Sequence, residues 1–92
     1  MRIDFSHKAY QRLEALAEYI HQESGSKKIT ASYLKKFRHY ILETLTHFPL
    51  AGRLSEELAP NTRKLVYQGF SIIYRIGDER IEIVTIYREN LP

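Results

Sequence analysis

Apolar residues in the first part of the chain recur at the spacing of an amphipathic helix. Between Ser6 and Gly25 they fall on one helical face, at Ala9, Leu13, Leu16, Ala17 and Ile20. Ser6 suits the N-cap because its hydroxyl can accept a hydrogen bond from an amide of the first turn, and Gly25 suits the left-handed position that ends many helices. We therefore predict a helix between these two residues.

A second apolar stripe predicts a helix from Lys27 to His47, which Pro49 brings to an end. Its positions are spaced by three and four residues: Leu34, Phe37, Ile41, Leu45 and Phe48. Because the loop between the two helices is short, they should pack as an antiparallel hairpin.

Elsewhere the apolar and polar residues alternate, which is the period of a β-strand. Four strands are predicted, at Arg2 to Ser6, Arg63 to Tyr67, Phe70 to Ile76 and Arg80 to Arg88. Turns fit at Gln68-Gly69 and Asp78-Glu79, and residues 49–61 should be a loop with a helical turn near Ser55 to Leu58. The expected fold class is α+β, with a short N-terminal strand and a helical hairpin packed on a twisted antiparallel β-meander. Residues 1–92 are expected to form a single domain.

Alternation also predicts the two faces of the meander. The face toward the helices should carry Leu65, Tyr67, Phe70, Ile72, Tyr74, Ile76, Ile81, Ile83, Thr85 and Tyr87. The opposite face should carry Lys64, Val66, Ser71, Ile73, Arg75, Arg80, Glu82, Val84, Ile86 and Arg88. With Leu13, Leu16, Phe37, Ile41 and Leu45 from the helices, Ile72 and Tyr74 are expected to form the core.

The second face combines an apolar centre with a basic rim, which is typical of a docking surface. A face turned only to water would not need four aliphatic residues. The alternative explanation is that part of the helical layer or the C-terminus folds over this face. The predicted partner-binding residues are Arg63, Lys64, Val66, Ile73, Arg75, Val84, Ile86 and Arg88. A register slip of one residue in the last strand would exchange its two faces. Arg75 has Glu82 opposite it in this register, so it can form an ion pair with Glu82 and need not contact a partner.

Composition excludes several classes of protein. The chain has 92 residues and no cysteine, so disulfide scaffolds and thiolate metal sites are ruled out. Charged residues interrupt the first 20 positions, and no apolar run approaches the roughly 20 residues of a membrane span. These features favour a cytoplasmic location. No metal site and no cofactor are expected, because His7, His21, His39 and His47 lack metal-ligand spacing and there is no glycine-rich phosphate loop.

The net charge of +3 is unevenly distributed. Between Ser24 and Leu42 there are five basic residues and no acid, and the rest of the chain carries −2. This local positive field suits either a nucleic acid or an acidic protein segment, although a solvated helix face is an equally good interpretation.

Cleavage of RNA without a metal remains a catalytic possibility. It requires a base for the 2′-hydroxyl, cations for the phosphorane and an acid for the leaving oxygen. The residues of suitable type are Lys64, Arg75, Tyr87 and Arg88. Alternation directs Tyr87 to the core side, and no histidine or carboxylate is clearly placed beside the others, so the set is incomplete and a binding function is preferred.

The order of these features resembles the RelE/ParE superfamily of bacterial toxins. The strand ending in "FS", the helical hairpin, "HFPLAGR" and "RKLVYQGFSIIYRI" occur in the superfamily's order over almost the whole chain. The most specific positions are Phe48, Pro49, Gly52, Arg53, Arg63, Phe70 and Ile72 to Ile76. The resemblance implies the toxin half of a type II toxin–antitoxin module, with an antitoxin partner that wraps the toxin in a hetero-oligomer.

The superfamily divides into two activities. RelE-like members cleave mRNA on the ribosome, whereas ParE-like members poison DNA gyrase. The long helices, the acidic stretch from Leu54 to Thr62 and a last strand without histidine make this chain more similar to the ParE-like branch. A gyrase-inhibiting toxin is therefore the prediction, and a ribosome-dependent nuclease or an inactive binding protein are the alternatives.

Overall fold

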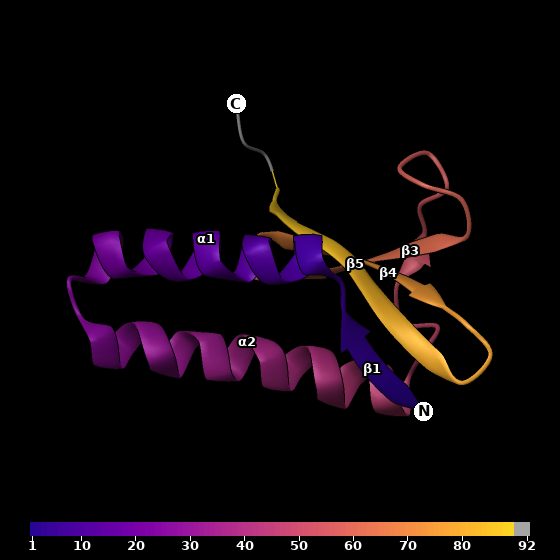
Figure 1. Ribbon diagram of the computed structural model, residues 1–92, viewed down its shortest axis with the longest axis horizontal. Coiled ribbons are helices and arrows are strands. Elements are labelled where there is room, and N and C mark those ends of the chain that lie inside the picture. Colours follow the sequence, from indigo (N-terminus) through magenta and orange to yellow (C-terminus); the bar gives the residue numbers. More distant parts are fainter. Residues whose placement is uncertain (90–92) are drawn as a thin grey trace.

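The computed structural model describes residues 1–89 and arranges them as a helical hairpin packed on one face of a sheet (Figure 1). The elements are β1 (Arg2–Phe5), α1 (His7–Ser24), α2 (Lys27–His47), β2 (Arg53–Leu54), β3 (Thr62–Tyr67), β4 (Phe70–Ile76) and β5 (Arg80–Arg88). The sheet order is β1-β5-β4-β3-β2. Figure 1 shows α1 and α2 side by side, with the tip of their hairpin projecting beyond the sheet. The predicted α+β class is confirmed.

Both helices begin and end where local sequence signals place them. The Ser6 hydroxyl accepts a hydrogen bond from the Ala9 amide at 3.0 Å and donates one to the Val84 carbonyl at 2.7 Å. The cap of α1 is therefore also its attachment to β5. Gly25 has φ 66°, the left-handed conformation that ends α1. Ser26 then caps α2 by accepting from the Ile29 amide at 3.1 Å.

The core lies between the hairpin and the sheet, and the seven core residues predicted from the sequence are all buried. Phe37 is its centre. Its ring meets Tyr67 and Phe70 edge-on, with ring centroids 5.7 Å apart in both pairs. Phe48 was predicted to continue the stripe of α2 but is 66% exposed, because the helix ends one residue earlier, at His47.

The β3–β4 turn has the predicted geometry. Gln68 and Gly69 have φ 49° and 84°, so both occupy the left-handed region of a two-residue hairpin turn. At the other end of β4 the Gly77 amide donates to the Arg80 carbonyl at 2.8 Å, which places Asp78 and Glu79 in the second turn.

A β-bulge in β5 overturns part of the predicted face assignment. Up to Ile83 the register matches strict alternation, but Tyr74 pairs with Ile83 while Ile73 pairs with Thr85, so Val84 has no partner on β4. The extra residue reverses the faces of the last part of β5. Ile86 therefore joins the helix-side core, whereas Thr85 and Tyr87 move to the opposite face.

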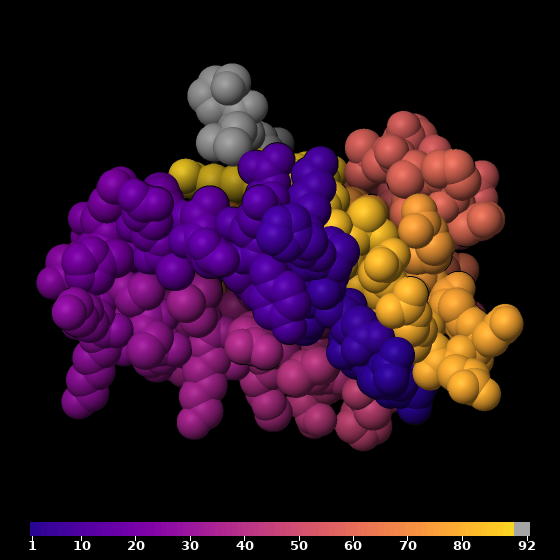
Figure 2. All heavy atoms as spheres, viewed as in Figure 1, coloured from indigo at the N-terminus to yellow at the C-terminus, as the bar shows by residue number. Residues whose placement is uncertain are grey.

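Two further strands complete the sheet. β1 pairs with β5 in parallel, with Ile3 opposite Ile81, so the sheet is mixed rather than wholly antiparallel. β2, which was predicted as loop, pairs with β3 through Arg53–Lys64 and Leu54–Arg63. The segment between β2 and β3 stands out from the sheet in Figure 2, and it contains the predicted turn, closed by a bond from the Leu58 amide to the Ser55 carbonyl. Neither helix is long and apolar enough to cross a membrane.

Candidate functional site

The face of the sheet opposite the helices, called here the open face, is crossed by rows of paired residues. The central row runs from Arg53 through Lys64 and Ile73 to Thr85. Val66, Ser71 and Tyr87 form the next row, and Thr62, Arg75 and Glu82 form the row on the other side. Most of the cations expected on this face are present, but each of the central ones has a close partner.

Lys64 and Glu89 form an ion pair on the open face. Their side chains are only 13% and 23% exposed, and the Ser71 hydroxyl donates a hydrogen bond to the same carboxylate. The backbone also fixes Glu89, because its amide donates to the Gly69 carbonyl at 2.6 Å. The hairpin turn that joins β3 to β4 therefore holds the carboxylate beside the lysine.

This pairing shifts the pKa of both groups toward their charged forms. The hydrogen bond to Glu89 raises the pKa of the Lys64 ammonium, and the hydrogen bonds from Lys64 and then Ser71 lower the pKa of the Glu89 carboxyl. A carboxylate with a lowered pKa is a weak proton acceptor, and an ammonium with a raised pKa is a weak proton donor. The pair therefore favours a fixed-charge role for this cluster over proton transfer.

Tyr87 lies on the open face and not on the core side as predicted. The Lys64 ammonium is 6.0 Å from the centre of the Tyr87 ring. The bulge at Val84 is the reason, since it reverses the direction of every side chain that follows. Of the four candidate catalytic residues, Lys64 and Tyr87 are thus brought together.

The other two candidates are not brought to the Lys64–Tyr87 cluster. Arg75 pairs with Glu82 at 3.4 Å, as the predicted register required. Arg88 lies on the helix side of the sheet, where its guanidinium stacks over the Tyr19 ring at 4.6 Å. The bulge at Val84 explains the positions of both Arg88 and Ile86, so neither Arg88 nor Ile86 contributes to the open face.

The apolar residues predicted to be the centre of a docking surface differ in exposure. Val66 is 51% exposed and remains available to a partner, and Val84 is partly exposed at the bulge. Ile73 points to the open face but is only 2% exposed, between Lys64 and Thr85 on the flanking strands. Sequence alternation identified the direction of the Ile73 side chain but not its burial.

Arg63 was predicted to bind a partner, but its side chain forms a hydrogen bond within the fold. Its guanidinium donates to the Gly52 carbonyl at 2.7 Å. The Gly52 amide in turn donates to the Tyr74 hydroxyl at 2.8 Å, and that hydroxyl donates to the Pro49 carbonyl at 2.7 Å. Burial raises the pKa of the Tyr74 phenol. Arg63 and Tyr74 therefore anchor the loop from Pro49 to Gly52.

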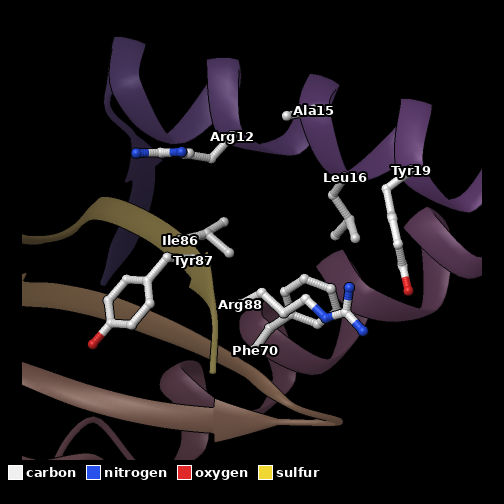
Figure 3. Close-up of a pocket in the computed structure, with 8 residues that line it drawn as sticks. All are labelled: Arg12, Ala15, Leu16, Tyr19, Phe70, Ile86, Tyr87 and Arg88. Atoms are coloured by element: carbon white, nitrogen blue, oxygen red, sulfur yellow. The ribbon is translucent and has the colours of Figure 1, made fainter. Parts of the chain in front are cut away.

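A cavity of about 260 Å³ lies between α1 and the end of β5. Figure 3 shows Tyr19 descending from α1 toward Arg88, whereas the Arg12 side chain extends sideways below the helix. The cavity is lined by Arg12, Ala15, Leu16, Tyr19, Phe70, Ile86, Tyr87 and Arg88. Within residues 1–89, neither of its two arginines forms an ion pair. In the same range, no three His, Asp or Glu side chains are grouped to hold a metal ion.

Comparisons with known proteins agree on one fold. A family model described as "ParE toxin of type II toxin-antitoxin system, parDE" matches residues 3–90. The chain resembles the chromosomal ParDE toxin–antitoxin system of P. aeruginosa, with TM-score 0.83, 24% identity and coverage of 98% of this chain and 97% of that one. It also resembles the RelBE2 toxin–antitoxin complex of Mycobacterium tuberculosis, with TM-score 0.64, 22% identity and 96% coverage of both chains.

A more distant likeness is to YafQ of E. coli strain BL21(DE3), with TM-score 0.52, 14% identity and coverage of 96% of this chain and 93% of that one. No curated sequence matched the chain. At these identities the solved structures demonstrate the fold, whereas the family model spans nearly the whole sequence.

Proposed function

Because the chain belongs to the family of ParE toxins of type II toxin–antitoxin systems, we propose that it inhibits DNA gyrase and is neutralised by a cognate antitoxin. The inhibition is by binding, with no bond of the target hydrolysed by the toxin. The match to the ParE family supports gyrase as the target, since gyrase is what resemblance to the ParE-like branch implies.

The Lys64–Glu89 pair carries the proposal that the toxin binds and does not cleave. General base catalysis at neutral pH needs a group whose pKa lies near 7. The lowered pKa of Glu89 and the raised pKa of Lys64 move both groups away from that value. Arginine side chains are poor bases, so Arg75 does not supply one. The two cations, Lys64 and Arg75, are suited to holding an acidic partner in place.

The antitoxin is proposed to contact the open face. Related structures are described as a ParDE toxin–antitoxin system and a RelBE2 toxin–antitoxin complex, so both relatives pair with an antitoxin. On this chain Val66 offers exposed apolar area, and Lys64, Arg75 and Val84 belong to other positions of the same sheet. An acidic, partly apolar segment would complement this surface.

A ribosome-dependent nuclease is the second candidate, and the proximity of Lys64 and Tyr87 favours it. A lysine, a tyrosine and the Glu89 carboxylate on one face could serve as cation, acid and base if the ion pair opened. This function would require the substrate phosphate to displace Glu89 from Lys64.

A supercoiling assay separates the two candidates. Purified toxin added to gyrase and relaxed plasmid should inhibit supercoiling or accumulate cleaved DNA, and equimolar antitoxin should restore activity. A parallel translation extract with a labelled mRNA should show no toxin-dependent cuts. Codon-specific cuts that disappear with Lys64→Ala would establish the nuclease instead, and unaffected gyrase at micromolar toxin would refute the proposed target.

A further inference from the structure

The solvent face of α2 carries a group of basic residues, called here the basic face. At 3.6 residues per turn, Lys28, Lys35 and His39 fall within about 40° of one another around the helix axis. They lie on the side of the helix opposite the buried Phe37 and Ile41. The row is about 16 Å long. Its borders are set by further exposed cations, namely Lys27, Lys36 and Arg38.

Arg38 contacts the fold, with its guanidinium 5.7 Å from the centre of the Phe5 ring, but within the described part of the chain the cations of the basic face are not paired with acids. Among residues 1–89, none of the five lysines and arginines forms an ion pair with an acid. Lys27 and Lys28 occupy the first turn of α2, where the helix dipole disfavours positive charge, and that turn contains no acidic residue. Lys35 and Arg38 are three residues apart, a spacing at which like charges repel. The row therefore lowers helix stability slightly, and its cost points to a role in binding.

The chemistry of the row fits a phosphate backbone better than a protein surface. Between Lys28 and Lys35 the exposed positions are Ile29, Ala31 and Ser32, and Ile29 lies about 100° around the helix axis from Lys28. Protein interfaces are usually anchored by large apolar or aromatic side chains in desolvated pockets, and the line from Lys28 to Lys35 itself has only the small residues Ala31 and Ser32 beside it. Lysines on flexible stems act as point charges for phosphate, and a row of them matches the linear charge of a duplex.

We propose that the basic face of α2 binds the phosphate backbone of double-stranded DNA without reading its bases. Long side chains extend from α2 along the lower edge of the molecule in Figure 2. The helix packs on the face of the sheet opposite the open face, so the two surfaces are separate. The toxin can therefore hold DNA and a protein partner at the same time. This inference goes beyond gyrase inhibition, and it is tested without gyrase so that either proposal can fail alone.

The test measures binding of antitoxin-free toxin to a fluorescein-labelled duplex of about 20 base pairs by anisotropy, over a range of salt concentrations. If three to five phosphates are neutralised, log K should fall against log salt with a slope of about −2.7 to −4.5. Lys35→Ala should reduce the size of this slope by about one, and Lys28→Ala with Lys35→Ala by about two. A second duplex of unrelated sequence should bind with the same affinity.

Lys8→Ala is the matched control, because Lys8 is an exposed lysine on α1 and its loss changes the net charge equally. It should leave the slope unchanged, and circular dichroism should show all variants folded. If Lys8→Ala and Lys35→Ala reduce the slope of log K against log salt equally, the effect depends only on net charge, and the proposal is overturned. No binding at low salt would overturn it as well. Unchanged DNA binding together with weaker antitoxin binding in the α2 variants would assign the face to a protein.

Discussion

The Tyr74 hydroxyl lies 2.8 Å from the Gly52 amide nitrogen and accepts its hydrogen bond, which joins the middle of β4 to a loop 22 residues earlier in the chain. The same hydroxyl donates to the Pro49 carbonyl at 2.7 Å. Arg63 completes the arrangement by donating to the Gly52 carbonyl. Several of the positions most typical of the superfamily are therefore parts of one loop anchor, and their spacing follows from the geometry of the fold.

Removal of the hydroxyl should weaken this anchor. Tyr74 is fully buried, so Tyr74→Phe leaves the Gly52 amide and the Pro49 carbonyl without their partner. An unsatisfied buried polar group costs about 1–3 kcal/mol. Urea unfolding should show a loss of that size with an unchanged m-value. An unchanged midpoint would mean that water replaces the hydroxyl at no cost.

Gly52 should tolerate no side chain, although its backbone conformation would allow one. A Cβ at this position would lie 2.7 Å from a ring carbon of Tyr74 and 2.8 Å from the Lys64 carbonyl oxygen. Because one of these neighbours is backbone, the strand must shift, and overpacking of this kind costs typically 1–3 kcal/mol. Gly52→Ala should lower the urea midpoint, whereas Ala51→Gly next to it should have a smaller effect. Equal effects would argue against the clash.

The elements and the core could be predicted from the sequence because local signals agree with the tertiary structure. Ser6, Gly25 and Pro49 mark helix boundaries by backbone chemistry that needs no distant partner. The faces of β5 could not be predicted from alternation alone, since the bulge adds a residue that alternation does not count. A signal was nevertheless present: the apolar positions change phase between Ile83 and Ile86, and a strand with one buried side changes phase where it bulges.

The ion pair of the candidate site was harder to predict. Lys64 lies within β3 and Glu89 directly follows β5, so their contact depends on the registers of β3, β4 and β5 together. Two-residue β2 was missed for a related reason. A strand that short has no periodicity, and its existence depends on pairing with β3.

Phe37 is the residue on which the packing of the hairpin most depends. Its ring is fully buried and contacts both Tyr67 and Phe70. Phe37→Ala removes these contacts and leaves a cavity, at a cost of about 3–5 kcal/mol. This is a large part of the stability of a small domain. Thermal unfolding followed by circular dichroism should show a much lower midpoint or an unfolded protein at room temperature. Tyr10→Ala, at an exposed position of α1, is the comparison and should change the midpoint far less.

The Lys64–Glu89 pair predicts a specific dependence of stability on pH. The pKa of Glu89 is lowered by folding, so its contribution is present above about pH 4.3, the ordinary value for glutamate, and is lost as pH falls through the lower folded value. The pKa of Lys64 is raised, so its contribution is present below about pH 10.4 and is lost as pH rises through the higher folded value.

Glu89→Gln should therefore lower the urea midpoint by a constant amount between about pH 5 and pH 9. Below about pH 4 the difference from the unmodified protein should shrink, because the carboxyl becomes protonated there. The opposite result is a difference in urea midpoint between Glu89→Gln and the unmodified protein that stays constant down to about pH 2. That result would mean that Gln fails to replace the hydrogen bond from Ser71, and that the charge on Glu89 contributes nothing.

The open face as an antitoxin site is best tested at Val66. The sequence alone suggested Ile73 as the centre of that surface, but Ile73 is 2% exposed, so a charge there should unfold the protein before it affects a partner. Val66 is 51% exposed on the same face, and Val66→Glu places a carboxylate where an acidic, partly apolar segment is proposed to lie. The loss of binding free energy should reach about 2 kcal/mol, or roughly 30-fold in Kd for the cognate antitoxin.

Ile29→Glu is the matched control, since Ile29 is 55% exposed but belongs to α2. Titration calorimetry with both variants, after circular dichroism has shown them folded, should give a weaker complex only for Val66→Glu. If the two variants bind alike, the antitoxin docks elsewhere, and the cavity between Arg12 and Arg88 becomes the next surface to alter.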